Sequence, residues 1–205
     1  MTEIGRRLTH VSGTLVPLVY LLDLISWAQL RLLVGGGALL AVALEAVRLG
    51  VSLDWWVYDR LTREYESDSP AGYALAVVSA AVVVWAGPVP VALAAVLMLT
   101  LGDPVAGVLG SAGVGERKAL RVMAVVLGLC LAIGLTFLPP RAAVPAAVVA
   151  TLADSYTPRV AGVVVDDNAA IPLGAALFAV LGPVLLPPLC GAGCPAPLVD
   201  VSHGG

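Results

Sequence analysis

The stretch LGDPVAGVLGSAGVGERKALR, residues 101–121, separates two long apolar runs and holds much of the unusual chemistry of the chain. It contains Gly-Asp-Pro at 102–104, glycines at 107, 110, 113 and 115, and Glu-Arg-Lys at 116–118. Lys118 is the single lysine among 205 residues. Glycines let a backbone approach a bound group and leave its N–H groups free to donate. A loop that is acidic at one end and cationic at the other suits a metal ion and the phosphates it chelates.

A second interpretation of this stretch stays open. Gly-rich turns join helices in many proteins, and basic residues beside them often only mark the cytoplasmic side of a membrane. The spacing also departs from the Gly-xxxx-Gly-Lys-(Ser/Thr) pattern of a P-loop. The positions of the other charges therefore have to decide between the two interpretations.

The composition predicts a membrane protein. Apolar residues make up 60% of the chain, charged residues 12%, and the mean hydropathy is +0.98, whereas soluble domains carry about 25% charged residues. Several apolar runs approach or exceed ~18 residues, the length of a transmembrane helix. We therefore predict an all-α, polytopic helix bundle in the cell membrane. A net charge of −3 without a basic patch argues against nucleic acid as a partner.

The apolar runs define the predicted domain organisation. One integral membrane domain covers residues 1–186, and a Pro/Gly-rich tail follows at 187–205. We predict seven spans, at residues 8–25, 32–51, 71–86, 91–101, 119–138, 142–156 and 169–186. The fourth is short because Gly102-Asp103-Pro104 is expected to end it, with residues 105–111 forming a broken half-helix that dips back into the protein.

Basic residues set the predicted orientation. With seven spans, Arg31 and Arg141 lie on one side, while Lys118 and the remaining arginines lie on the other. Positive charge collects on the cytoplasmic side. We therefore predict a cytoplasmic N-terminus, with most of the polar residues in or beside the spans at the cytoplasmic interface.

Carboxylates inside or beside spans are candidate functional groups, because placing them there costs several kcal/mol. Four of them, on three segments, are candidate ligands for Mg²⁺, which prefers hard oxygen ligands and shares nucleotide phosphates: Asp103, Asp154, Asp166 and Asp167. Asp103 is expected at a helix C-terminus, where the dipole disfavours a carboxylate and a cation would offset it.

Several of these residues also have structural interpretations. Glu45 and Arg48 are three residues apart and can form an ion pair within one helix. Asp166-Asp167-Asn168 precedes a helix and can provide its N-cap. His10 is as readily a packed polar residue as a catalytic one. Lys118, in a loop, is expected to be removable with little loss of stability.

Four motifs, in order, resemble the polyprenol kinase family, which includes dolichol kinase, phytol kinase and CTP-dependent diacylglycerol kinase. Arg6-Arg7-Leu8-Thr9-His10 resembles an opening Arg-Lys-x-x-His, and Glu45-Ala46-Val47-Arg48 a Glu-x-x-Arg at the end of the second span. Residues 101–106 with Gly110 resemble a Gly-Asp-x-x-Ala nucleotide loop, and residues 166–173 resemble Asp-(Asp/Asn)-Asn-Leu-x-Ile-Pro. The resemblance is incomplete after the loop, where only Lys118 remains of Lys-(Ser/Thr)-x-Glu-Gly, and Asp154 stands where a glutamate is typical.

The resemblance implies transfer of a phosphoryl group from CTP to a lipid alcohol with Mg²⁺ as cofactor. It implies that the phosphates are bound by Lys118, with Arg117 as a further candidate, and by Gly102, Gly107 and Gly110. Asp103 with Asp166 or Asp167 would hold Mg²⁺, and Asp103, Asp167 or His10 would accept the alcohol proton. Arg7, Glu45, Arg48 and Asn168 would support the site. We expect Arg7, Glu45, Asp103, Lys118 and Asp167 to surround one cavity.

Two other functions stay open. A CDP-lipid synthase also joins CTP to a lipid in the membrane, but its usual Asp-Arg-x-x-Asp signature is missing from this sequence. A non-catalytic membrane protein descended from the kinases would explain the altered residues after Lys118. The lipid alcohol and the oligomeric state are not determined by the sequence.

Overall fold

The computed structural model describes residues 11–51, 69–110, 115–160, 163–187, 196–199 and 201. Arg7 and His10 lie outside these residues. The fold is helical apart from one short antiparallel hairpin, in which Arg159 pairs with Val164 and Val160 with Val163. The elements, in order, are α2 (Leu15–Leu21), α3 (Trp27–Val51), α5 (Gly72–Ala86), α6 (Val89–Leu109), α7 (Leu120–Phe137), α8 (Pro140–Ser155), β1 (Arg159–Val160), β2 (Val163–Val164) and α9 (Asp167–Leu185).

The predicted all-α class is confirmed, and four helices in the described part of the chain are long and apolar enough to cross a membrane: α3, α6, α7 and α9. Helix α5 is apolar but has 15 residues, and α8 has 16. Helix α2 has only seven residues, because the chain turns after it at Asp23, which has a positive φ of 55°. The described residues therefore support four of the seven predicted spans by length and composition.

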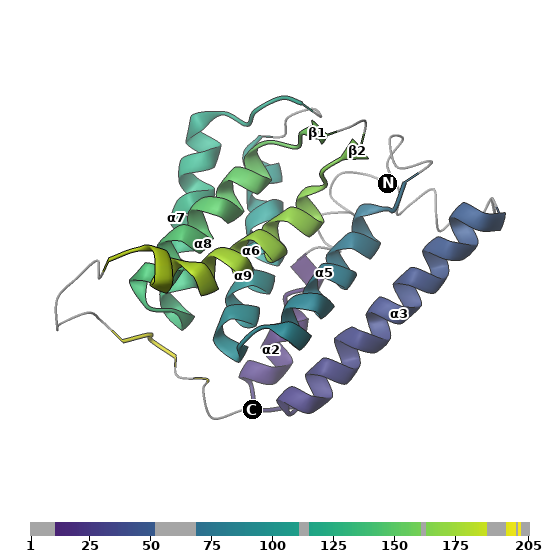
Figure 1. Ribbon diagram of the computed structural model, residues 1–205, viewed down its shortest axis with the longest axis horizontal. Helices are drawn as coiled ribbons and strands as arrows, with labels where there is room; N and C mark the ends of the chain where they lie inside the picture. Colours follow the sequence, from purple (N-terminus) through teal and green to yellow (C-terminus); the bar gives the residue numbers. More distant parts are fainter. Residues whose placement is uncertain are drawn as a thin grey trace.

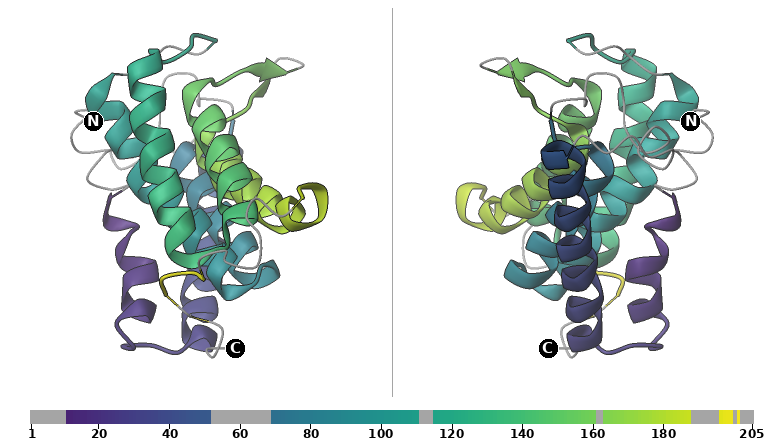
Figure 2. Two further views of the ribbon diagram at one scale, coloured as in Figure 1. Left: turned by 90° about the vertical axis from the view of Figure 1, so that its left-hand side faces the viewer. Right: turned by 90° about the vertical axis from the view of Figure 1, so that its right-hand side faces the viewer.

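Helix α6 forms the centre of the bundle. Every residue from Val91 to Thr100 is buried, and α6 packs against α5, α7, α8 and α9. Helix α3 lies at one side and packs mainly on α5, while α8 and α9 pair on the other side (Figures 1 and 2). Asp103, near the end of α6, is half-buried and lies between the buried residues Gly102 and Pro104.

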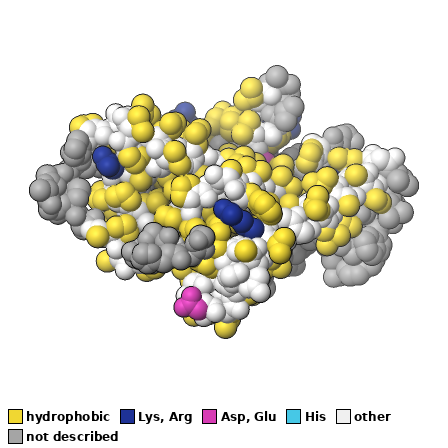
Figure 3. Space-filling model, turned by 60° about the horizontal axis from the view of Figure 1, so that its bottom comes forward, with side chains coloured by type: hydrophobic (Ala, Val, Ile, Leu, Met, Phe, Trp, Pro, Cys, Tyr) yellow, Lys and Arg dark blue, Asp and Glu magenta, His cyan; other side chains and the backbone are white. Residues whose placement is uncertain are grey.

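The outer surface is apolar, as a lipid environment requires. Large apolar side chains are exposed along α3 and at the end of α9, including Leu32, Leu39, Leu40, Val184 and Leu185. On the face shown in Figure 3, apolar side chains predominate and charged atoms form only small separate patches. Exposed apolar area of this extent is rare on soluble monomers.

The predicted break at Gly102-Asp103-Pro104 is wrong: α6 runs without interruption from Val89 to Leu109, with Pro104 inside it. Pro104 has no N–H for the carbonyl of Thr100, yet Gly102, Pro104 and Ala106 are buried against neighbouring helices. Tertiary packing of this kind lets membrane helices retain internal prolines. Asp103 therefore lies more than one turn before the helix end, so the predicted unfavourable dipole at a C-terminus does not apply to it.

Helices α8 and α9 approach closely at Gly182. A Cβ atom added there would lie 2.6 Å from Cγ of Pro145 and closer still to the carbonyl oxygen of Arg141. Neither group moves easily, since one is a ring and the other is helix backbone. The small size of Gly182 therefore sets the separation of the two helices.

Replacing Gly182 with alanine is expected to lower the free energy of unfolding by about 1–3 kcal/mol, because the α8–α9 contact becomes overpacked. Gly128 in α7 is the matched control, since an added Cβ there meets no atom within 4 Å. Gly128→Ala is expected to be neutral or to stabilise the protein by up to ~1 kcal/mol through helix propensity. Unfolding in detergent, followed by circular dichroism, measures both, and equal stability of the two variants would contradict the expectation.

Candidate functional site

The candidate site lies at what we call the polar end of the bundle, where α6 and α8 end and α7 and α9 begin, near β1 and β2 (Figure 1). The polar-end cluster contains one cation, four carboxylates and one amide: Lys118, Asp103, Asp154, Asp166, Asp167 and Asn168.

Backbone pairing positions Lys118. The segment before α7 lies antiparallel to the residues that follow α8, with an isolated bridge between Arg117 and Tyr156. The N–H of Lys118 donates to the carbonyl of Ser155 at 3.1 Å, and the N–H of Gly115 donates to the carbonyl of Thr157 at 3.1 Å. Gly115 has φ +83°, a conformation that suits glycine. This pairing holds Lys118 at the end of α8.

Lys118 and Asp154 form a buried ion pair. Nζ of Lys118 lies 2.9 Å from Oδ1 of Asp154, and the two side chains are 10% and 2% exposed. Arg117, one residue earlier, points elsewhere: its guanidinium lies 5.7 Å from the ring centroid of Tyr156, and the residue is exposed. Lys118 thus provides the buried cation of the candidate site. Arg117 lies at its exposed edge, over the ring of Tyr156.

The start of α9 supplies the second half of the cluster. Asp166 is the N-cap, and its Oδ1 accepts from the backbone N–H of Asn168 at 2.9 Å and from Nδ2 of Asn168 at 2.7 Å. Nδ2 of Asn168 also donates to Oδ1 of Asp167 at 3.2 Å. The predicted N-cap role is confirmed for Asp166. Ser79 of α5 fixes this segment by donating to the carbonyl of Asn168 at 2.9 Å.

The carboxylates interact with one another electrostatically. Asp154 is repelled by the charges of Asp103 and Asp167, while Lys118 attracts it. Three carboxylates from α6, α8 and α9 thus act on the same region, and Lys118 is the cation paired there. The excess of negative charge favours binding of a cation.

Two buried oxygen atoms of this cluster have no hydrogen-bond partner within the part of the chain that the structure describes: Oδ2 of Asp154 and Oδ1 of Asn168. Both residues are at least 98% buried. A buried acceptor without a donor costs about 1–3 kcal/mol. Both atoms are hard oxygen ligands, which suit a divalent cation or its bound water.

The cluster is not a complete metal cage. Among the described residues, no three Asp, Glu, His or Cys side chains lie close enough together to hold an ion on their own. Mg²⁺ sites commonly need only one or two carboxylates, with waters and phosphate oxygens as the other ligands. The acidic side chains of the described residues therefore do not form a complete metal site by themselves.

The predicted glycine loop is partly helix. Gly102 and Gly107 lie within α6, where their N–H groups belong to the helix, and the N–H of Gly110 donates to the carbonyl of Ala106 at 3.0 Å. These three N–H groups are therefore not available to a phosphate in this conformation. The rest of the predicted loop, residues 111–114, lies outside the described residues.

The predicted ion pair between Glu45 and Arg48 is confirmed, with Nη2 of Arg48 2.7 Å from Oε2 of Glu45. Glu45 also accepts from the N–H of Ala71 at 3.0 Å and from the hydroxyl of Tyr73 at 2.6 Å. Arg48 donates to the carbonyl of Ser69 at 2.6 Å. These contacts tie the end of α3 to the start of α5, so both residues have a clear structural role.

Sequence reasoning missed the contribution of α5. Ser79 and Tyr73 contact Asn168 and Glu45, which the sequence did identify. The sequence does indicate that these two residues are unusual, because few polar side chains interrupt the apolar run of α5. Their partners lie 89 and 28 residues away, so the sequence alone could not pair them.

Comparison with protein-family models, characterised proteins and solved structures gives no match for this chain. The observations that bear on function are the side chains of the polar-end cluster and the resemblance of the sequence motifs.

Proposed function

We propose that the protein is a CTP-dependent lipid kinase that phosphorylates an isoprenoid alcohol of the dolichol or polyprenol type. The proposal combines the motif resemblance with the chemistry of the polar-end cluster. It includes a multi-pass chain in the cell membrane with the N-terminus and the polar end on the cytoplasmic side, where the nucleotide is found. The acceptor is insoluble in water and presents its hydroxyl group at the level of the lipid headgroups.

The single observation that carries the proposal is a pair of buried oxygens that have no donor among the described residues: Oδ2 of Asp154, whose carboxylate is paired with Lys118, and Oδ1 of Asn168. A merely structural ion pair would need no second set of carboxylates nearby, yet Asp103 and Asp167 also act on Asp154. A metal–phosphate ligand would supply a cation for these oxygens and a second anion for the ammonium group, which is paired with Asp154.

The residues present fit Mg²⁺. Two of the polar-end carboxylates would hold it, either Asp103 with Asp166 or Asp167, or Oδ2 of Asp154 with one of these. Mg²⁺, when bound, neutralises charge on the phosphoryl group that is transferred. Since no three acidic or imidazole ligands group together in the described part of the chain, the nucleotide phosphates would complete the coordination.

The chain's own residues would position the reactants and move one proton. Lys118 would exchange its contact with Asp154 for a contact with the phosphates, and Arg117 would approach them from the rim. Asp103, Asp167 or His10 would accept the proton of the alcohol hydroxyl as its oxygen attacks the γ-phosphorus and CDP leaves. In-line phosphoryl transfer of this kind depends mainly on positioning and charge neutralisation.

Incubation of the purified protein with Mg²⁺, a polyprenol and CTP labelled at either the α- or the γ-phosphorus tests the proposal. We expect label in the lipid from γ-labelled CTP alone. Label from α-labelled CTP with phosphatidate as acceptor would instead identify a CDP-lipid synthase. Absence of lipid label from both, in folded protein, would indicate a non-catalytic membrane protein.

A further inference from the structure

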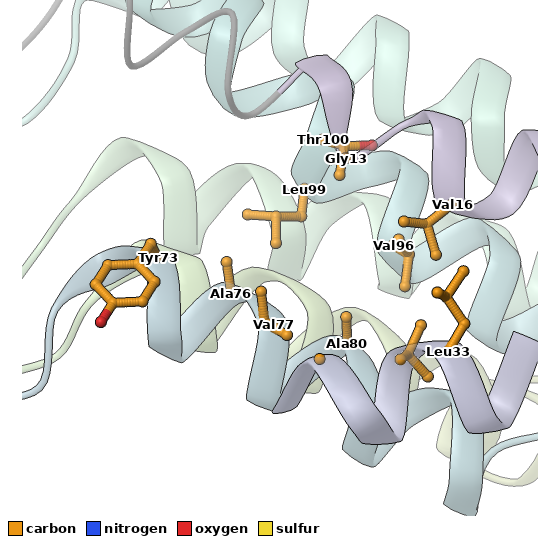
Figure 4. A pocket seen from close by; sticks show the side chains of 12 residues that line it. Gly13, Val16, Leu33, Tyr73, Ala76, Val77, Ala80, Val96, Leu99 and Thr100 are labelled. Carbon is orange, nitrogen blue, oxygen red and sulfur yellow. The ribbon is translucent and has the colours of Figure 1, made fainter. Parts of the chain in front are cut away.

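A cavity of about 350 Å³ lies between α2, α3, α5 and α6. Figure 4 shows its lining: Tyr73, Ala76, Val77 and Ala80 follow one another along α5, and Val96, Leu99 and Thr100 of α6 lie opposite them. The remaining lining residues are Gly13, Val16, Leu33, Val34 and Gly37. The volume is in the range of small-ligand pockets, and the lining is almost entirely apolar.

The cavity is closed at the end remote from the polar end. A second void there, of about 10 Å³, shares Val16, Val34, Ala80 and Val96 with it and is bounded by Pro17, Leu30, Val84, Ala92 and Leu93. A void of this size holds at most one water-sized group. An apolar chain in the cavity would therefore enter from the polar end or from the side. It would end at the residues that surround this small void.

Asp103 is not a lining residue of the cavity, but it lies one helical turn beyond the lining residues of α6. Leu99 and Thr100 line the cavity, and Asp103 follows them by four and three residues in the same uninterrupted helix, α6. Residues at these spacings lie on one helix face, one turn or about 5–6 Å apart. Asp103 thus lies next to the mouth of an apolar cavity as well as in the polar-end cluster.

The polar groups of the cavity also lie toward this end. The hydroxyl of Tyr73 donates to Glu45 at 2.6 Å, and the hydroxyl of Thr14 donates to that of Thr100 at 3.1 Å. The cavity therefore has an apolar interior with hydroxyl groups near its mouth, which matches a hydrocarbon chain that ends in a hydroxyl group.

We propose that this cavity binds the hydroxyl-bearing end of a single-chain isoprenoid alcohol, with the hydroxyl next to Asp103. This inference rests on the proposed kinase function and specifies its acceptor. A cavity of about 350 Å³ is at the small end of ligand pockets, so it accommodates part of one hydrocarbon chain. A diacylglycerol has two chains and would need a second apolar binding site. The neighbouring groove around Gly36 and Trp85 is separated from the cavity by the α3–α5 contact.

Adjacent glycines of α3 offer a matched pair of variants. Gly37 lines the cavity, and a Cβ atom there would meet Cγ1 of Val77 at an ordinary 3.5 Å. Gly36 faces the outer groove, and a Cβ atom there meets nothing within 4 Å. Gly37→Leu fills the cavity, whereas Gly36→Leu makes the same change of residue type on the outside. Both substitutions change helix propensity equally.

The test uses a photoreactive diazirine derivative of geranylgeraniol in detergent micelles without nucleotide, with labelled residues mapped by mass spectrometry. We expect labelling of cavity residues on α5 and α6, displaced by excess geranylgeraniol and not by dioctanoylglycerol. Gly37→Leu should reduce this labelling about tenfold or more, since the added side chain excludes the probe. Gly36→Leu should label like the wild type.

Wild-type labelling in Gly37→Leu would overturn the inference, and so would equal displacement by dioctanoylglycerol. If Gly37→Leu does not fold, the smaller change Ala80→Val serves the same purpose with the same expected direction, because Ala80 also lines the cavity. Binding is measured without CTP. Cavity labelling in a protein that transfers no γ-phosphate would therefore count against the kinase function and leave the cavity assignment intact.

Discussion

Asp103→Asn is expected to abolish phosphoryl transfer from CTP to the lipid at any Mg²⁺ concentration, with a loss of about 10³-fold or more. Asparagine preserves the size of the side chain and one oxygen but removes the charge. Asp103 is the residue that joins the two parts of the proposed site, since it acts on Asp154 and lies one helical turn beyond Leu99 and Thr100 of the apolar cavity. In the proposed site, its charge would act both on the metal–nucleotide complex and on the hydroxyl of the acceptor.

Asp23→Asn is the matched control for this substitution. Asp23 is exposed in the connection between α2 and α3, remote from the polar end, and its φ of 55° is a conformation that asparagine also adopts. Initial rates with γ-labelled CTP should match the wild type for this variant. A rate within about tenfold of the wild type for folded Asp103→Asn would show that Asp103 does not bind the metal or the acceptor.

Lys118→Met is expected to lower the free energy of unfolding by about 3–5 kcal/mol, because it leaves the carboxylate of Asp154 buried without its counter-charge. The side chain of Asp154 is only 2% exposed and lies 2.9 Å from Nζ of Lys118. The sequence suggested the opposite, namely that a loop lysine could be removed with little loss of stability. The buried partner is the reason for the revised expectation.

The double variant Lys118→Met/Asp154→Leu is expected to regain most of the lost stability, since it removes both charges and fills the site with apolar groups. Arg121→Met is the control, because Arg121 is an exposed cation at the start of α7. Denaturant unfolding in detergent measures all three. Equal unfolding midpoints for Lys118→Met and Arg121→Met would mean that the ion pair contributes nothing to stability.

The helical parts of the fold were largely predictable, because long apolar runs bounded by Pro, Gly or charged residues define membrane helices. The boundaries of α5, α7, α8 and α9 differ by at most two residues from the predicted spans. Helix α6 was predicted wrongly, since a local rule that proline breaks helices was applied to a segment whose surroundings stabilise it.

Local contacts of the candidate site were also predictable. The N-cap of Asp166 and the ion pair of Glu45 with Arg48 involve residues two or three positions apart, so sequence spacing is enough to indicate them. The contact between Lys118 and Asp154 joins residues 36 positions apart. It depends on the backbone pairing between the segment before α7 and the residues after α8, for which the sequence has no simple signal.

The cavity was likewise beyond sequence reasoning. Its shape depends on which small residues of α3 and α5, such as Gly37 and Ala76, face one another across the helix contacts. Apolar patterns indicate that a helix is buried, but they do not indicate where the packing leaves space. The sequence therefore indicated the charged groups of the candidate site but not the cavity.

The central claim is that the polar-end carboxylates and Lys118 bind a divalent cation together with the phosphates of CTP. Electron paramagnetic resonance of Mn²⁺, used in place of Mg²⁺, tests this most directly through its magnetic coupling to phosphorus nuclei. We predict one protein-bound Mn²⁺ per chain in the presence of CTP, coupled to nucleotide phosphorus and lost in Asp103→Asn but retained in Asp23→Asn. Failure of CTP to bring Mn²⁺ onto the wild-type protein, or equal binding by Asp103→Asn, would contradict the claim.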